Sequence, residues 1–141
     1  MNTKKVMNWT IEEAQMKHVA RKYSMSSVAQ TYLRKTSAEA GIDDYKKLLE
    51  DLQGDPSKYD SLTDAERDFC DVSSSLGVWA TVAGCVKPYI SIDQWLALDY
   101  PTVELLSDTA SEINPHWFAQ PEQEKKTDAT PSEFTENSQN S

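Results

Sequence analysis

The sequence predicts an all-α protein, a small bundle of five to six helices with a disordered acidic tail at its C-terminus. Three observations favour this class. The 141 residues include only four Gly and six Pro, too few turn-forming residues for a fold of many strands. Three segments have the form of a capping box, a local pattern that begins helices. Between them apolar residues recur at helical spacing, which indicates helices with one buried face.

The length fits one domain, because a domain takes roughly 150 residues. We expect a flexible N-terminus at residues 1–8, a helical domain at 9–118 and a disordered tail at 119–141. The tail is rich in Ser, Thr and Glu, and its single large apolar residue, Phe134, buries too little surface to offset the entropy of ordering the chain.

The first helices are expected in the N-terminal third. The box Thr10-Ile11-Glu12-Glu13 predicts a helix that begins at Thr10 and ends near Tyr23. A second helix is expected after Ser24, where one apolar stripe follows helical spacing (Met25, Val28, Ala29, Tyr32 and Leu33). A third covers residues 42–52 and stops at Gly54.

The longest helix is expected to begin at the second box, which starts at Thr63, and to end at Lys87-Pro88. It should be the most buried element. Gly77 and Gly84 lie on nearly one face of it, and glycine inside a helix is costly, so we expect another backbone to approach closely there.

Two shorter helices complete the domain. The third box, at residues 91–94, begins a short helix that carries Trp95 and Leu98. In the last helix Pro101 occupies the first turn, where proline is tolerated, and Asn114-Pro115 ends it.

The net charge of -9 is unevenly distributed. Residues 1–35 carry seven of the fourteen basic residues and only two acidic ones. The basic segment 17–35 admits a helix-turn-helix around Ser24, as in a small DNA-binding regulator. The acidic remainder opposes phosphate binding and disfavours a nucleic-acid partner. The simpler interpretation is that these bases contact acidic surface of the same molecule or lie on a solvated helix face.

No catalytic or metal-binding constellation is recognisable, which favours a non-enzymatic protein with no cofactor and no metal. Cys70 and Cys85 would lie roughly 22 Å apart on one continuous helix, too far for a disulfide, and are interpreted as buried hydrophobes. His18 and His116 have no partner His or Cys at ligand spacing. A pair of acids brought together only in space, as in a small acid-base enzyme, remains an alternative. No apolar run approaches the ~20 residues of a membrane span.

Four tryptophans are a heavy aromatic load for a small helical domain, because each buries on the order of 150–250 Å². Trp is also enriched in protein interfaces, so part of this aromatic surface is expected to bind a partner. Trp79 is assigned to the core. For the two aromatic residues after the last helix, an exposed knob and a core contact are both open. The candidate partner-binding residues are Trp95, Trp117, Phe118, Tyr32 and Leu33.

Two blocks of sequence carry a resemblance. LGVWATVAGCV at 76–86 and SIDQWLALDYPTVELLSDTASEIN at 91–114 precede an acidic Ser/Thr-rich tail. In this arrangement the chain resembles the tail assembly chaperones of long-tailed, lambda-like bacteriophages, best over residues 61–141.

The resemblance implies a non-enzymatic role in the cytoplasm of the infected bacterial cell. The chaperone would bind the helical tape measure protein, keep it soluble, recruit tail tube protein and be absent from the mature virion, with self-association left open. Such chaperones are commonly made in two lengths by ribosomal frameshifting, and Glu124-Lys125-Lys126 admits a slippery run of codons.

Overall fold

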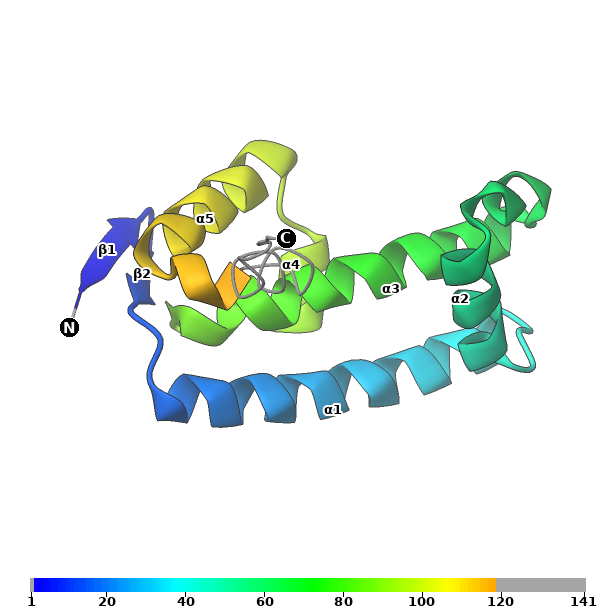
Figure 1. The fold of residues 1–141 in the computed structure, drawn as a ribbon, viewed down its shortest axis with the longest axis horizontal. Coiled ribbons are helices and arrows are strands. Elements are labelled where there is room, and N and C mark those ends of the chain that lie inside the picture. The colour runs from blue at the N-terminus through cyan, green and yellow to red at the C-terminus, as the bar shows by residue number, and fades with distance from the viewer. Residues whose placement is uncertain (1, 119–141) are drawn as a thin grey trace, which may run out of the picture.

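The computed structural model describes residues 2–118 and is largely helical, as predicted. "All-α" is only approximate, because a three-stranded antiparallel sheet lies at one end. Two long helices, α1 (Met16–Glu39) and α3 (Asp64–Val82), run in opposite directions along the molecule, and α2 (Tyr45–Gly54) lies across one end (Figure 1). The tail expected at 119–141 lies outside the described residues.

The N-terminus forms a hairpin, so the expected flexible segment at 1–8 and the helix from Thr10 are both wrong. Strands β1 (Thr3–Val6) and β2 (Trp9–Glu12) pair with Val6 opposite Trp9, and Met7 in the connection has a φ of 55°. The strand β3 (Val86–Lys87) pairs with the other edge of β2. A capping box is a short pattern, and here the pairing of β2 with distant residues overrides it.

α1 is one continuous helix, so the break expected at Ser24 is also wrong. The Ser24 hydroxyl donates to the carbonyl of Ala20 in the preceding helical turn. One buried stripe runs the length of the helix (His18, Met25, Ala29, Leu33 and Ser37). Because this stripe continues across Ser24 without Gly or Pro, nothing turns the chain, and the predicted helix-turn-helix does not form.

α2 begins at Tyr45, three residues later than expected, where the Asp44 carboxylate accepts from the amide of Lys47 at 3.1 Å. Gly41, with a φ of 76°, lies in the preceding turn. A 3₁₀ helix, η1 (Pro56–Ser61), leads into α3. No residue of α2 is fully buried. The helix packs against the core through leucines that are only half-buried.

α3 begins at the predicted capping box, with reciprocal bonds between Thr63 and Glu66. It ends at Val82 instead of Lys87, and the chain continues as η2 (Ala83–Cys85) and β3. The close approach expected at Gly77 and Gly84 is wrong, because a Cβ built on either would meet no atom within 4 Å. Gly77 faces solvent, and Gly84 lies beyond the α-helix in η2.

The last helices follow the sequence signals. α4 (Ile92–Leu96) begins at the Ser91 box, and α5 (Tyr100–Ile113) carries Pro101 in its first turn. A 3₁₀ helix, η3 (Pro115–Phe118), ends the described chain. The largest fully buried side chain, Trp79, lies on α3 at the centre of the core and donates to the carbonyl of Ile90 at 2.8 Å. None of the helices within residues 2–118 has the length and apolar content that crossing a bilayer needs.

Candidate functional site

Two of the candidate partner-binding residues are buried. Trp95 is 3% exposed, and its indole N–H donates to the hydroxyl of Ser75 at 3.0 Å. Leu33 is 8% exposed and belongs to the core stripe of α1. Both side chains complete the packing between helices, and neither forms an exposed partner surface of its own.

The aromatic residues after α5 are half-buried and do not form an exposed knob. The Trp117 indole N–H donates to the carbonyl of Thr81 at 2.9 Å, and the Lys22 ammonium lies 4.9 Å from the centre of its ring. Phe118 packs against the core. Together they fasten the end of the described chain to α1 and α3, which favours the core contact for this pair.

Tyr32, the remaining candidate, is half-buried beside a cavity of about 290 Å³ between α1 and α3. Phe69 and Val72 form much of its apolar lining, and Asp68 is its one charged side chain. Tyr32 thus lies at the edge of a small apolar cavity, separate from Trp117.

A second apolar hollow, of about 320 Å³, lies between α3, α4 and α5. We call it the α3–α5 groove. Trp95, Leu98 and Val103 are its more buried residues. Its exposed apolar side chains are Val78 at 45%, Leu96 at 38% and Tyr100 at 71%. Large apolar side chains exposed around one hollow are a feature of interaction sites.

The local sequence explains how the groove arises. Trp95 and Leu96 are adjacent on a helix of a little more than one turn, so their side chains point about 100° apart. Burying Trp95 therefore leaves Leu96 exposed. Tyr100 occupies the first position of α5, where its ring lies beside the same hollow. Two adjacent apolar residues on so short a helix are the sequence signal from which this half-exposed surface could have been inferred.

Three acidic residues are close in the sequence to the exposed lining residues of the α3–α5 groove. Asp93, Asp99 and Glu104 are exposed and lie within one helical turn of Leu96 or Tyr100. Glu104 accepts from the Tyr100 hydroxyl at 3.2 Å, and this hydrogen bond raises the Tyr100 pKa above its ordinary value of 10.0. Between residues 68 and 113 the one basic residue is Lys87. The groove is thus apolar, and the charged residues closest to its exposed lining in the sequence are acidic.

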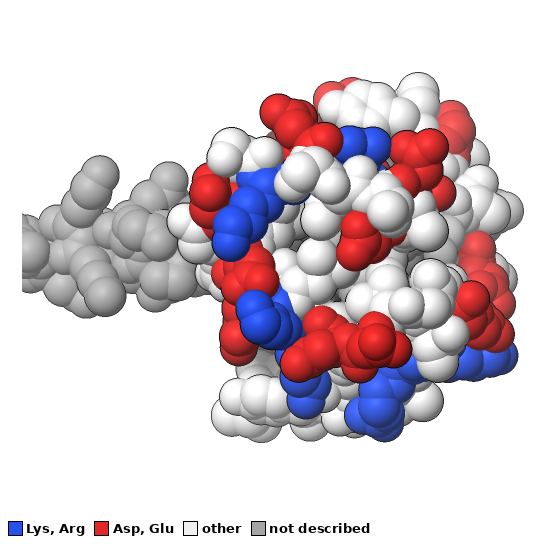
Figure 2. Space-filling model, turned by 90° about the vertical axis from the view of Figure 1, so that its right-hand side faces the viewer, with Lys and Arg blue, Asp and Glu red and all other residues white. Residues whose placement is uncertain are grey.

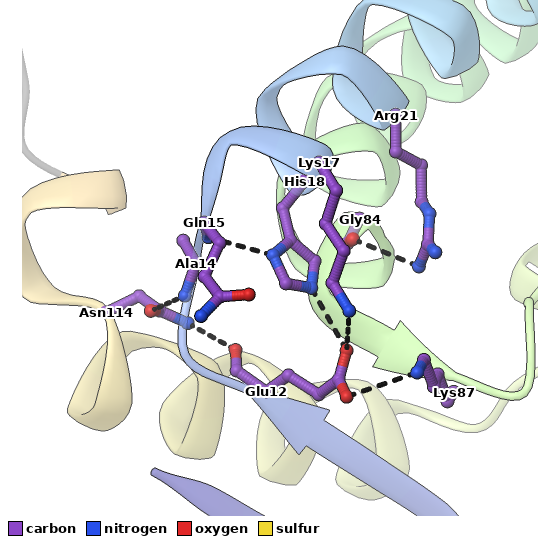
Figure 3. Close-up of polar contacts among 9 residues, drawn as sticks. All are labelled: Glu12, Ala14, Gln15, Lys17, His18, Arg21, Gly84, Lys87 and Asn114. Carbon is purple, nitrogen blue, oxygen red and sulfur yellow. Dashed lines mark hydrogen bonds and ion pairs between the residues drawn. The ribbon is translucent and has the colours of Figure 1, made fainter. Parts of the chain in front are cut away.

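A polar cluster centred on buried Glu12 and His18 joins the sheet to the start of α1 and the end of α5 (Figure 3). We call it the Glu12 cluster; its members are Glu12, Lys17, His18, Lys87 and Asn114. The Glu12 carboxylate accepts from the His18 Nε2–H at 3.0 Å and from Lys87 at 3.3 Å. His18 Nδ1 accepts from the amide of Gln15 at 2.8 Å, which places the ring proton on Nε2.

Asn114 ties the end of α5 to this cluster. Its amide group donates to the Glu12 carbonyl at 3.1 Å, and its side-chain oxygen accepts from the Ala14 amide at 2.6 Å. With Glu12 6% and His18 0% exposed, no substrate reaches the pair. The hydrogen bond from His18, and then that from Lys87, holds the Glu12 pKa below its ordinary value of 4.5, although burial opposes this. Sequence analysis missed the cluster, because its members come from four elements.

Three basic residues of segment 17–35 contact other parts of the molecule. The Lys17 ammonium lies 3.9 Å from the Glu12 carboxylate, and Arg21 donates to the Gly84 carbonyl at 3.5 Å (Figure 3). The Lys22 ammonium lies over the Trp117 ring. Of these three contacts one is to an acidic group, Glu12, whereas Arg34 and Lys35 are exposed on the helix surface. Figure 2 shows the end of the molecule formed by α2, where acidic and basic side chains alternate without a basic patch.

The two cysteines are free and buried, as interpreted. Burial raises the Cys85 pKa to about 11, which suppresses the reactive thiolate. Within residues 2–118 no three His, Cys, Asp or Glu side chains are grouped as metal ligands. Comparisons of the chain with protein-family models, with curated proteins and with solved structures found no match.

Proposed function

We propose that this protein is a non-enzymatic assembly chaperone that binds an amphipathic helix of a partner protein in the α3–α5 groove. The observation that carries the proposal is the exposure of Val78, Leu96 and Tyr100 around one apolar hollow. An amphipathic helix binds such a groove through apolar residues at helical spacing, which would cover these side chains.

The finer part of the proposal comes from the resemblance to phage tail assembly chaperones. The groove is built from the blocks 76–86 and 91–114 together with the preceding turn of α3, and those two blocks carry the resemblance. On this basis the partner is the tape measure protein, held soluble in the host cytoplasm until tail tube protein is recruited. The chaperone then leaves before the virion is complete.

Co-expression with a candidate tape measure protein, followed by a pull-down, tests the proposal. The decisive variant is the double substitution Val78→Gln/Tyr100→Gln, which keeps helix-forming residues and removes two apolar contacts. Truncating a hot-spot residue at the centre of an interface costs more than about 1 kcal/mol, so if both residues are hot spots we expect about 2–3 kcal/mol together, or roughly 30- to 150-fold weaker capture.

The chain offers a matched control. On α1, Val28 is 47% and Tyr23 is 73% exposed, nearly the same as Val78 and Tyr100. Val28→Gln/Tyr23→Gln should capture the partner as well as the unsubstituted protein. Equal capture by both double variants, each with unchanged helix content, would remove the groove from the proposal.

A further inference from the structure

We propose that the α3–α5 groove selects helices whose apolar face is flanked by Lys or Arg, an inference that rests on the proposed function. Exposed acidic residues adjoin lining residues of this apolar hollow in the sequence, and within residues 2–118 no basic side chain lines it. The partner's chemistry is therefore specified by charge as well as by apolar surface.

The carboxylates of these acidic residues are not neutralised within the described chain. Asp99 accepts from the hydroxyl of Thr102, and Glu104 accepts from that of Tyr100, both uncharged donors. Asp93 takes part in no ion pair within residues 2–118. Three negative charges thus remain available to a partner.

The nearest basic residues in the sequence are engaged elsewhere. Lys87 pairs with Glu12, and Arg67 pairs with Asp64 and donates to two carbonyl groups of η1. Neither lines the groove. A bound helix therefore meets an unopposed negative potential, which favours basic flanks and disfavours acidic ones.

Charge also argues against two other occupants of the groove. A second copy of the chain, docked through the same surface, would bring the same carboxylates against one another. Residues 119–141 contain five acidic and two basic residues, so their net charge has the same sign as the groove. A basic helix of another protein complements it.

The size of the expected preference for basic over acidic flanks can be estimated. An exposed ion pair changes affinity by up to about fivefold, so three carboxylates give a preference on the order of tenfold or more for basic over acidic flanks. Because the charges are exposed, raising the salt concentration should weaken this preference while leaving the apolar contribution.

Two synthetic helical peptides with the same Leu/Ala face test the inference, one with Lys flanks and one with Glu flanks. Their binding to the full-length protein is followed by fluorescence anisotropy at about 50 mM and about 500 mM NaCl. We expect the Lys peptide to bind at least tenfold tighter at low salt and the difference to shrink at high salt. Equal binding of the two peptides, or no binding of either, would overturn the inference.

The double variant Asp99→Asn/Glu104→Gln should weaken binding of the Lys peptide several-fold and leave the Glu peptide no weaker. Its matched control, Asp43→Asn/Glu50→Gln, makes the same change in net charge at and just before α2, outside the groove. Equal losses in the two variants would mean that overall charge, and not the groove, attracts the peptide.

These outcomes separate the inference from the proposed function. Suppose that the pull-down depends on Val78 and Tyr100 but the Lys and Glu peptides bind equally well. The groove then binds its partner, and the inferred preference for basic flanks is wrong. If the protein instead dimerises in analytical ultracentrifugation, and Val78→Gln alone abolishes the dimer, the occupant is a second copy and the inference also fails.

Discussion

Replacing Glu12 with Gln should destabilise the fold, because this carboxylate is the acceptor at the centre of the Glu12 cluster. Its oxygens lie 3.0 Å from His18 Nε2, 3.3 Å from the Lys87 ammonium and 3.9 Å from that of Lys17. Gln keeps one neutral acceptor for His18 but loses the charge that attracts both lysines. The substitution therefore weakens the connection between β2, β3 and the start of α1.

The magnitude follows from these contacts. A hydrogen bond to a charged group contributes about 1.5–3 kcal/mol and a neutral one about 1 kcal/mol, so the His18 contact loses about 1 kcal/mol. The side chains of Lys17 and Lys87 are half-exposed, and each pair adds only about 0.5 kcal/mol. The expected loss of unfolding free energy is about 2 kcal/mol, which lowers the Tm by roughly 8 °C in a domain of this size.

The loss of stability caused by Glu12→Gln should be large at neutral pH and should shrink in acid. The Glu12 pKa in the folded protein lies below its ordinary value of 4.5, so its stabilisation is fully present above about 4.5. This contribution is lost as the pH falls through the lower, folded value. Urea unfolding followed by circular dichroism should therefore show the two proteins far apart at pH 7 and converging below pH 4.5.

A neighbouring residue gives the control for Glu12. The substitution Glu13→Gln makes the same change in net charge, but within residues 2–118 the Glu13 carboxylate accepts only from the exposed backbone amide of Asn2. Glu13→Gln should lose less than about 1 kcal/mol. A Glu12→Gln protein as stable as the unsubstituted one at pH 7, or a gap between them that does not narrow in acid, would refute the role of the cluster.

Three further predictions concern the core and the helix ends. Trp79→Phe leaves the Ile90 carbonyl without its donor and should lower the unfolding free energy by about 2–3 kcal/mol in urea titrations; an unchanged midpoint would contradict the buried hydrogen bond. Because burial raises the pKa of Cys85 to about 11, its thiol should resist Ellman's reagent at pH 8 in the native protein and react on unfolding, whereas rapid native labelling would place it at the surface. Thr63→Ala should cost about 1 kcal/mol through the lost cap of α3, with Thr63→Ser restoring most of it; equal midpoints for the two variants would show that the hydroxyl does not cap.

Local signals predicted part of the fold well. The boxes at Thr63 and Ser91 begin helices because each is satisfied by side chains three residues apart, whatever the rest of the chain does. Asn114 likewise ends α5 as predicted. The box at Thr10 has the same form and fails, because residues 9–12 instead exchange hydrogen bonds with both neighbouring strands. A local pattern predicts an element only where no distant partner competes.

Distant contacts account for what sequence analysis missed. Glu12 and Asn114 are 102 residues apart and meet only once the hairpin and α5 are in place. The same holds for the candidate site. Aromatic content led to Trp95, which the packing of α4 on α3 buries, whereas its neighbour Leu96 remains exposed. Residue type alone does not show which side chain is exposed, because the buried face of a short helix depends on what packs beside it.

The placement of the basic residues links the fold to the choice of partner. Lys17, Arg21 and Lys22 contact Glu12, a backbone carbonyl and the Trp117 ring, so they stabilise the joint between α1, β2 and the end of α5. Charges used in this way are not free to release counterions from a phosphate backbone, which is what drives nucleic-acid binding. The groove surface on the other elements is left acidic and apolar. Such a surface repels nucleic acid and suits a basic amphipathic helix, so under the proposed function a gel shift at near-physiological salt should show no complex with duplex DNA.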